Sequence, residues 1–503
     1  MLARLASATL KGLDAEAVDV EVDLSRGLPA WNLVGLPEAA VRESRERVRS
    51  ALLNSGFEFP LKRITVNLAP ADLRKDGSHF DLPMAIGMLL ASGQLATNRP
   101  AEQPFLLGEL ALDGRLNAVT GALPLVMFAR AKQHYAVILP LANLAEVVAV
   151  EGIDILPAEN LLQVVQHLAD TARIEPAEID ADAPCAEENI PDMADIRGQQ
   201  QARRALEIAA AGGHHLLMTG SPGVGKSMLA KCLPGILPPL TLEQRLEVTR
   251  IYSVSADTSR PPMSARPPFR SPHHSASDVA IIGGGTNPRP GEISKADHGI
   301  LFLDELPEHK RQVLETLRQP LEDGKVCVAR AAESVEFPAR FQLVAAMNPC
   351  PCGYLGHPTK PCRCAPAQIR RYTARISGPL LDRFDLRVHV PPVEREELAR
   401  MLPGESSERV AARVALARRR QFERLGDGRV NARMTPAETE RFSKPDTNGA
   451  KLLDQAMHRF SLSARSYHRI LRVARTIADL ESAEQVESQH IAEALNYRGE
   501  EIT

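Results

Sequence analysis

Apolar and polar residues alternate over short stretches in the first third of the chain, and this period of two is typical of half-buried strands. Residues 38–53 and 81–94 instead carry apolar positions at helical spacing, which predicts two helices. We therefore expect residues 1–170 to fold as one mixed α/β domain. The alternating stretches are residues 18–24 and 64–68, and further strands are predicted at residues 105–112 and 136–139.

The pattern changes twice in the rest of the chain. Residues 171–195 hold eight acidic residues, one base and several prolines, a composition that predicts a linker. The proline-rich residues 234–290 show no clear period, so we expect loops and insertions there. Beyond Pro392 the pattern turns to long helices rich in Arg, Ala and Leu, which end near Tyr497. The predicted parts are an α/β domain at 1–170, a linker at 171–195, an α/β core at 196–392 and a helical domain at 393–503.

Composition places the chain among globular proteins. Its 503 residues are 44% hydrophobic and 24% charged, which excludes a disordered or fibrous protein. The formal charge of −3 means that a nucleic acid would have to be held by local basic patches. No stretch approaches the roughly 18 apolar residues that span a bilayer, and the first residues do not resemble a signal peptide. We expect a cytoplasmic protein with no membrane contact.

A glycine-rich loop follows the apolar residues 216–218 and precedes a predicted helix. It satisfies the GxxxxGK[ST] pattern, in which backbone N–H groups turn inward around phosphates. Lys226 would reach the β and γ oxygens, and Ser227 would bind Mg²⁺. A chance glycine-rich turn is the alternative, which the flanking strand and helix make less favourable. The predicted nucleotide-binding residues are Gly220, Ser221, Pro222, Gly223, Val224, Gly225, Lys226 and Ser227.

Two further strands end in polar residues. Residues 299–305 are an apolar run that closes with two acids, as a central parallel strand would. Asp304 can complete a magnesium shell, and Glu305 can orient and deprotonate the attacking water. The strand at residues 341–346 leads to Asn348, whose amide can polarise the same water, although an Asn after a strand is more often a turn residue. Together these residues predict an ATP and Mg²⁺ site.

With these motifs the chain resembles the AAA+ ATPases, and within them the magnesium-chelatase-like branch. That branch carries an insert in helix 2, which residues 269–293 match, and a hairpin before the sensor strand. Residues 325–337 look like this hairpin, with Arg330 near its tip. The resemblance also places Gly198 and Gln199 on the adenine side of the nucleotide.

The same resemblance implies two arginines at the ATP site. Arg383, in Gly378-Pro-Leu-Leu-Asp-Arg-Phe-Asp, matches the arginine finger, which reaches the γ-phosphate of a neighbouring subunit and therefore needs a ring. Arg465, in Leu462-Ser-Ala-Arg, matches the second sensor of the helical lid, although Arg469 and Arg472 on nearby turns could substitute. Without the family context, surface salt bridges would be favoured for these arginines.

Four cysteines form two CxC pairs, with nine residues between the pairs, directly after the segment that holds Asn348. Four thiolates this close in sequence can form a tetrahedral Zn²⁺ site, and zinc would keep them deprotonated. Reduced cysteines in a redox-sensitive loop are the alternative. His357 inside the loop is a further candidate ligand. The predicted zinc ligands are Cys350, Cys352, Cys362 and Cys364.

Residues 360–387 hold seven bases and two acids, so this stretch can bind a polyanion. The alternative is that several of its arginines serve subunit interfaces. Within the first domain, residues 74–81 and 107–115 resemble the signature segments of the Lon-type protease domain. The nucleophilic serine of that family aligns with His79 here, and its general-base lysine aligns with Leu123. Because a serine cannot attack without a base, we expect no peptidase activity.

Over essentially its whole length the chain is similar to the ComM/YifB family. This resemblance implies a homohexameric ATPase that binds single-stranded and branched DNA and drives branch migration in homologous recombination during natural transformation, with the recombinase machinery as a further partner. The alternative is a metal-chelatase-type AAA+ subunit that acts on a partner protein, and a third class is an ATP-dependent protease or unfoldase. His79 and Leu123 argue against proteolysis, and the first domain and the CxC pairs argue against chelation.

Overall fold

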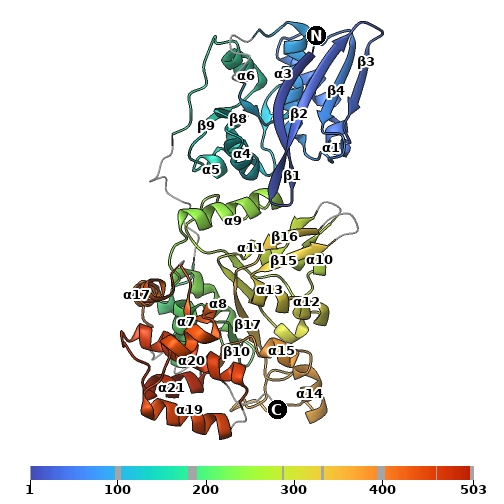
Figure 1. The fold of residues 1–503 in the computed structure, drawn as a ribbon. Helices are drawn as coiled ribbons and strands as arrows, with labels where there is room; N and C mark the ends of the chain where they lie inside the picture. The colour runs from blue at the N-terminus through green and yellow to red at the C-terminus, as the bar shows by residue number, and fades with distance from the viewer. Residues whose placement is uncertain are drawn as a thin grey trace. The chain divides into compact units, whose positions relative to one another are not determined.

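The computed structural model divides the chain into two compact units (Figure 1). The first unit comprises Met1–Ala186 and Arg245–Ser264, and the second comprises Glu187–Gln244 and Ala265–Thr503. Arg245–Ser264, which the sequence placed within the core, thus packs with the first unit. The described residues are 2–96, 103–178, 190–285, 288–329, 334–393, 403–426, 428–459 and 462–498.

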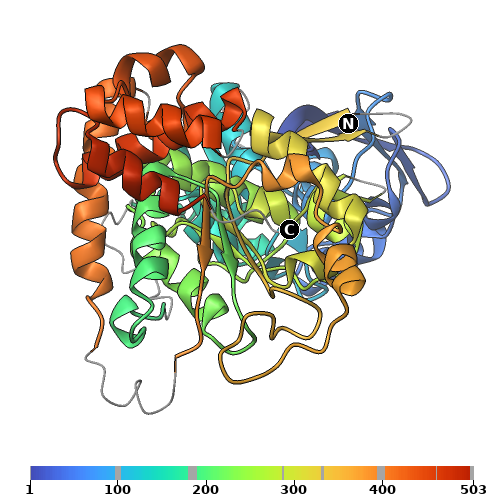
Figure 2. The same ribbon diagram turned by 90° about the horizontal axis from the view of Figure 1, so that it is seen from below.

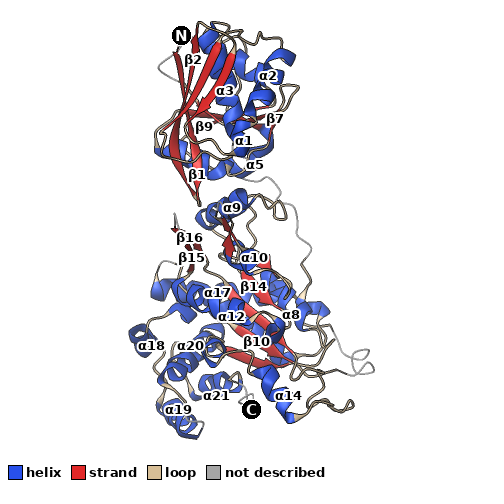
Figure 3. Cartoon of the chain, turned by 90° about the vertical axis from the view of Figure 1, so that its right-hand side faces the viewer, coloured by secondary structure: helices blue, strands red, loops and turns tan. Residues whose placement is uncertain are grey.

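A four-stranded sheet forms one layer of the first unit. In spatial order its strands are β1 (Leu2–Lys11), β2 (Asp14–Ser25), β4 (Arg63–Ala69) and β3 (Ala30–Val34). All neighbours are antiparallel except β3 and β4, which are parallel. Val18, Val20 and Val22 of β2 are buried, and helix α3 (Asp81–Ser92) packs on β1 and β2 (Figure 3). The predictions of strands at 18–24 and 64–68 and of a helix at 81–94 are confirmed.

The rest of the first unit surrounds a smaller parallel sheet of β5 (Phe105–Leu106), β8 (Ala136–Pro140) and β9 (Asp154–Ala158). The helix predicted at 38–53 is present as α1 (Ala39–Arg42) and α2 (Ser44–Asn54). The strand predicted at 105–112 is wrong in its length, since Gly108 leaves the strand to bond the backbones of His79 and Leu82. Further elements are β6 (Glu109–Leu110), β7 (Leu116–Asn117), α4 (Ala122–Ala131), α5 (Leu144–Val147) and α6 (Leu161–Leu168).

The expectation of loops throughout residues 234–290 is wrong for one stretch. Helix α9 (Leu242–Ser255) lies there, because its fourteen residues contain neither proline nor glycine although prolines flank them on both sides. Within the first unit, the Ser253 carbonyl of this helix accepts from the Gly121 N–H at 3.1 Å, and Arg250 forms an ion pair with Asp14 at 3.1 Å. These contacts hold the inserted segment in the first unit.

A five-stranded sheet forms the centre of the second unit, and all its strands are parallel. In spatial order they are β11 (Phe269–Arg270), β14 (Ile300–Leu303), β17 (Gln342–Met347), β10 (Leu216–Thr219) and β18 (Leu386–His389). Every residue of β14 and β17 is buried, as expected for central parallel strands, and Gln342 at the start of β17 is the one polar residue among them. The carboxyl ends of β10, β14 and β17 therefore meet at one edge of the sheet. Helices α7 (Gln200–Gly212) and α8 (Lys226–Cys232) flank β10 in sequence.

The C-terminal range is helical, as the sequence predicts. Figure 2 shows these helices, in orange to red, gathered together, and α17 and α20 pack on α7 of the same unit. Asp479 is almost fully buried among them, where Arg424 at 2.6 Å and Arg475 at 3.0 Å neutralise its charge. The helices are α17 (Ser407–Leu425), α18 (Pro436–Phe442), α19 (Thr447–Arg459), α20 (Ala464–Leu480) and α21 (Ser488–Asn496).

The hairpin expected from the family resemblance is present. Val326 pairs with Phe337 and Val328 with Val335, while Arg330, the expected tip residue, lies outside the described residues. Its strands are β15 (Lys325–Ala329) and β16 (Ser334–Pro338). Within the described parts of the chain, no helix combines the length and apolar character that crossing a membrane requires. The remaining elements are α10 (Asp278–Ile282), β12 (Gly283–Gly284), β13 (Arg289–Pro290), α11 (Glu292–Lys295), α12 (Arg311–Thr316), α13 (Arg318–Asp323), α14 (Pro366–Thr373) and α15 (Gly378–Leu381).

Candidate nucleotide site and cysteine loop

The phosphate loop connects β10 to α8. Gly223 has φ +80° and Gly225 has φ +93°, and a Cβ at either position would meet no atom within 4 Å. Glycine is therefore required at these two positions for its left-handed backbone rather than for lack of space. The loop leads directly into α8, so its N–H groups lie at the positive end of a helix dipole.

Lys226, the first residue of α8, is only 8% exposed. Its ammonium donates to the carbonyl oxygens of Gly220 at 2.6 Å and Ser221 at 3.0 Å, and to the side-chain oxygen of Asn348 at 3.1 Å. Burial lowers the pKa of Lys226 from its ordinary value, while the carboxylates of Asp304 and Glu305 act in the opposite direction. The lysine thus connects the phosphate loop to the end of β17.

The residues after β14 complete the other side of the site. The Ser227 hydroxyl donates to a carboxylate oxygen of Asp304 at 2.6 Å, and the second oxygen of Asp304 accepts from the Glu305 N–H at 2.9 Å. Glu305 has φ +49°, a strained backbone for a residue with a side chain. The carboxylate of Glu305 is exposed.

All of these groups border one cavity of about 330 Å³. The residues lining it are Pro222, Gly223, Gly225, Lys226, Ser227, Met228, Asp304, Glu305, Met347 and Asn348. The structure therefore brings five of the eight predicted loop residues together with the two acids and the asparagine, whereas Gly220, Ser221 and Val224 do not line the cavity. Carboxylate and hydroxyl oxygens beside a glycine-rich loop are the combination that a magnesium-bound phosphate chain requires.

The two candidate arginines do not line this cavity. Arg383 follows α15, and its guanidinium forms an ion pair with Glu322 of α13. Burial lowers the pKa of Arg383 from its ordinary value, and the nearby cations Arg465 and Arg318 lower it further. Arg465 is exposed at the start of α20. Both arginines therefore lie in one basic neighbourhood outside the cavity of their own chain.

The two possible substitutes for Arg465 are engaged elsewhere in the second unit. Arg469 donates to the Phe384 carbonyl at 3.2 Å and lies 3.7 Å from the Asp385 carboxylate. Arg472 donates to the Thr439 hydroxyl at 3.1 Å. Because these contacts engage Arg469 and Arg472 within the second unit, Arg465 remains the favoured candidate for the second sensor.

Gly198 and Gln199 precede α7 and also lie outside the cavity. Gln199 has φ +49°, and its amide donates to the Pro391 carbonyl at 2.7 Å, which joins the start of α7 to the residues after β18.

One neighbour of the site was not anticipated. The His274 ring nitrogen Nδ1 lies 3.2 Å from a carboxylate oxygen of Glu305. His274 also packs against the rings of His273 and His309, and the His309 ring contacts the Asp304 carbonyl at 3.1 Å. The paired histidines fall within the insert matched by the family resemblance, but their spacing in sequence gives no sign of the contact with Glu305.

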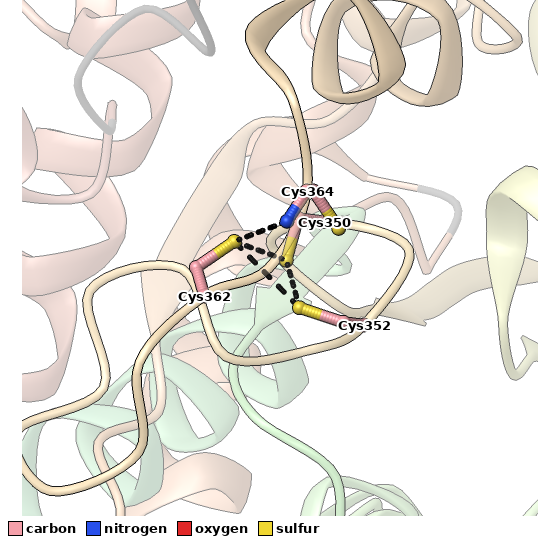
Figure 4. A group of neighbouring side chains, drawn as sticks. All are labelled: Cys350, Cys352, Cys362 and Cys364. Carbon is pink, nitrogen blue, oxygen red and sulfur yellow. Dashed lines mark hydrogen bonds between the residues drawn. The ribbon is translucent and has the colours of Figure 1, made fainter.

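The four cysteines converge on one point (Figure 4). Their Sγ atoms all lie within 4.8 Å of one another, although the two CxC pairs are far apart in the loop. The Cys350 Sγ lies 3.4 Å from that of Cys352 and 3.6 Å from that of Cys362. His357 instead accepts hydrogen bonds from the backbone of Thr359 and Lys360. The thiols therefore form a tetrad without the histidine.

The thiols of this tetrad differ in acidity. N–H groups of Arg363 and Tyr354 lower the pKa of Cys352 to about 6. At Cys362 an N–H from Cys364 acts in the same direction, but burial and the neighbouring thiols prevail and raise its pKa to about 12. One thiolate thus forms readily and opposes the next, a repulsion that a bound cation would remove.

The basic stretch at residues 360–387 divides into two groups. Lys360 lies over the Tyr354 ring, Arg375 pairs with Glu308 at 2.7 Å, and Arg387 donates to the Leu381 carbonyl. With Arg383, these bases have partners within the chain. The other arginines of the stretch, Arg363, Arg370 and Arg371, are exposed.

In the first unit, the two residues that align with the protease dyad, His79 and Leu123, are both buried. The His79 ring is 2% exposed and contacts the Ala8 carbonyl at 2.8 Å, and burial lowers its pKa to about 4. The Ser78 hydroxyl donates to the Glu109 carboxylate. Leu123 is fully buried in the core around α4. The buried Lys75 donates to the carbonyl of Pro70.

Known families match the chain in three consecutive segments. Residues 20–143 match the family described as subunit ChlI of Mg-chelatase, residues 192–398 match magnesium chelatase, subunit ChlI, and residues 404–498 match its C-terminal region. The competence protein ComM of Haemophilus influenzae is 47% identical, over 99% of this chain and 97% of the relative. The uncharacterized protein YifB of Escherichia coli is 46% identical, over 97% of this chain and 95% of the relative. A magnesium-chelatase 38 kDa subunit of Cereibacter sphaeroides is 26% identical over 31% of this chain and 51% of the relative.

Proposed function

The chain belongs to the ComM/YifB family of magnesium-chelatase-like AAA+ proteins, and we propose that it is an ATP-dependent hexameric DNA motor. Its task in this proposal is branch migration in homologous recombination during natural transformation, in contact with the recombinase machinery. The observation that carries the proposal is the single cavity shared by the phosphate loop, Asp304, Glu305 and Asn348. The similarity to a competence protein over nearly the full length of the chain supports DNA as the substrate on which this proposed ATPase acts.

In this proposal the cavity binds ATP with Mg²⁺. Glycine N–H groups and Lys226 hold the phosphates, while Ser227 and Asp304 supply oxygen ligands to the metal. Glu305 accepts the proton of the attacking water, and Asn348 polarises that water. The observed bond between Lys226 and Asn348 supports the shared role, because it places both groups on the same side of the cavity.

We further propose that Arg383 and Arg465 complete the site from the basic neighbourhood outside the cavity. Arg383 would exchange Glu322 for the γ-phosphate held by an adjacent subunit, which makes hydrolysis depend on the ring. Arg465 would sense the nucleotide from the helical domain. Gly198 and Gln199 would border the adenine through the segment before α7.

We infer that the tetrad of cysteines holds one structural Zn²⁺. Four thiols without an open position form the donor set that structural zinc prefers, and a divalent cation removes the repulsion between the thiolates. Elemental analysis of the purified protein should give about one zinc per chain. A folded, active and metal-free protein would contradict this assignment and favour the redox-sensitive loop.

The predicted four-part division also belongs to this proposal. The first unit would be a Lon-protease-like domain that has lost proteolysis, followed by the acidic linker, the AAA+ core and the helical lid. The buried positions of His79 and Leu123 support the loss, because neither side chain can approach a peptide in this fold. Such a domain is left with roles in binding and assembly.

Binding to DNA separates this proposal from the alternative of a chelatase-type subunit acting on a protein. The exposed Arg363, Arg370 and Arg371 are the proposed phosphate contacts. Substituting each by Ala should weaken single-stranded DNA binding and lower the slope of log K against log salt by about 0.7 per lost contact. Lys451→Ala, which removes an exposed charge on α19, is the control. Lys226-dependent ATP hydrolysis without salt-sensitive DNA binding would favour the chelatase-type function.

A further inference from the structure

The loop that carries the four cysteines touches the phosphate loop. Gly353, between Cys352 and Tyr354, has φ +81°, and a Cβ built there would lie 2.4 Å from Cδ and 2.7 Å from Cγ of Pro222. Real Cβ atoms essentially never approach other heavy atoms closer than 3.0 Å. The backbone of the cysteine loop therefore rests directly on the ring of Pro222, the third residue of the phosphate loop.

The contact depends on the same turn that brings the first two thiols together. The Gly353 N–H donates to the Cys350 carbonyl at 2.9 Å, which closes a turn around Cys352. This turn sets the 3.4 Å separation between the Sγ atoms of Cys350 and Cys352, and it also presents the Gly353 backbone to Pro222. A change in the spacing of these thiols must therefore shift the surface against which Pro222 packs.

A second connection runs through the end of β17. Cys350 lies two residues after Asn348, whose side chain accepts from Lys226 at 3.1 Å. The backbone of Asn348 also hydrogen-bonds the hydroxyl of Tyr372, on the helix that follows the last cysteine. The cysteine loop is thus tied to the nucleotide cavity at both of its ends and at its middle.

We propose that the cysteine loop, residues 350–364, is a positioning element of the nucleotide site, so that a metal held by its four thiols controls nucleotide affinity through Gly353 and Pro222. This inference rests on the proposed ATP site and the proposed zinc. With the thiols held together, Gly353 supports the phosphate loop in the form that binds phosphates. When no metal holds the thiols together, the support that Gly353 gives to Pro222 shifts, and the N–H groups of the phosphate loop lose their common direction.

Two glycines of the same loop provide a matched test. Gly356 has φ +75°, close to that of Gly353, but a Cβ there would meet nothing within 4 Å. Gly353→Ala and Gly356→Ala therefore impose a similar backbone cost, and only the first pushes against Pro222. We expect Gly353→Ala to weaken binding of a fluorescent ATP analogue by about tenfold or more, and Gly356→Ala by less than about twofold. Both variants should keep their zinc.

A double variant tests the direction of the contact. Pro222→Ala removes the Cγ and Cδ atoms that the new Cβ would strike, so Gly353→Ala combined with Pro222→Ala should bind the analogue more tightly than Gly353→Ala alone. A purely structural defect in the cysteine loop would not be relieved by a change in the phosphate loop. Equal affinity of the single and double variants would overturn the proposed contact.

Metal removal tests the proposal without any substitution, and so serves if Gly353→Ala does not fold. Stripping the metal from the full chain with a mercurial and a chelator should weaken analogue binding, and added Zn²⁺ should restore it. Unchanged affinity after stripping, or equal affinities of the two glycine variants, would overturn the inference. If the wild-type protein itself does not bind the analogue through Lys226, the proposed ATP site fails instead, and the two failures are thereby distinguished.

Discussion

Two regions of the chain carry residues that align with enzyme signatures, and they fold in opposite ways. Around the phosphate loop the matched side chains line one cavity. Lys226 donates a hydrogen bond to Asn348 there, and Ser227 donates one to Asp304. In the first unit His79 and Leu123 are both buried, and neither lines the cavity beside the phosphate loop. The contrast teaches that a signature indicates chemistry only where its side chains share a space that a substrate can enter.

We expect the largest effect on ATP hydrolysis from a substitution at the proposed catalytic base in the cavity. Glu305→Gln removes the proposed base while keeping the size of the side chain, so ATP turnover should fall by about 10²- to 10⁴-fold with ATP binding retained. Steady-state hydrolysis and binding of a fluorescent ATP analogue measure the two quantities. Glu308→Gln is the control, because Glu308 pairs with Arg375 outside the cavity. Near-normal turnover of the Glu305 variant would remove it from the base role.

The reverse experiment rebuilds the signature in the first unit. His79→Ser with Leu123→Lys restores the residue types of the protease dyad, but it places an ammonium in a fully buried apolar core. We expect no peptide hydrolysis and a loss of about 3 kcal/mol or more in the stability of this unit. Urea unfolding followed by tryptophan fluorescence reports on it selectively, since Trp31 is the single tryptophan of the chain. Leu123→Met should cost less than about 1.5 kcal/mol, and peptidase activity in the double variant would refute the contrast.

The buried imidazole of His79 predicts a pH dependence in the first unit. Burial lowers its pKa from 6.5 to about 4 in the folded chain, so the unfolded chain binds the proton first as the pH falls. The contribution of His79 to stability is fully present above pH 6.5 and is lost between pH 6.5 and 4, by up to about 3 kcal/mol. Asp81, whose pKa burial raises to about 6, acts in the opposite direction.

A substitution at His79 isolates the contribution of this residue to the pH dependence of stability. His79→Gln should flatten the pH dependence of the Trp31 unfolding midpoint between pH 7 and 4 relative to the wild type. His458→Gln changes an exposed histidine of α19 and should leave the dependence unaltered. Parallel pH profiles for the wild type and the His79 variant would show that the imidazole does not resist protonation.

We expect the smallest effect from an experiment that tests whether Arg383 of one subunit acts on the nucleotide of the adjacent subunit. Lys226→Ala and Arg383→Ala chains should each be inactive alone, yet a one-to-one mixture leaves about a quarter of the ring interfaces with both residues intact. We expect a corresponding partial return of ATP hydrolysis. Mixing either variant with itself provides the baseline, and a mixture no more active than that baseline would count against Arg383 acting across subunits.

The assembled cavity could be predicted from sequence because its parts are local motifs on parallel strands. Asp304 and Asn348 each end a buried strand, and the carboxyl ends of parallel strands must meet at one edge of the sheet. The contact of His274 with Glu305 and that of Gly353 with Pro222 could not, since each depends on where a loop returns in space. Helix α9 was not predicted from the sequence, because the prolines around it dominate the local composition.

The most direct test of the whole account is migration of a labelled synthetic DNA junction by the purified protein. The account predicts resolution of the junction that requires ATP and that is lost in the Lys226→Ala variant. A protein that hydrolyses ATP through Lys226 yet neither binds nor moves the junction would contradict the DNA motor and favour an ATPase that acts on another protein.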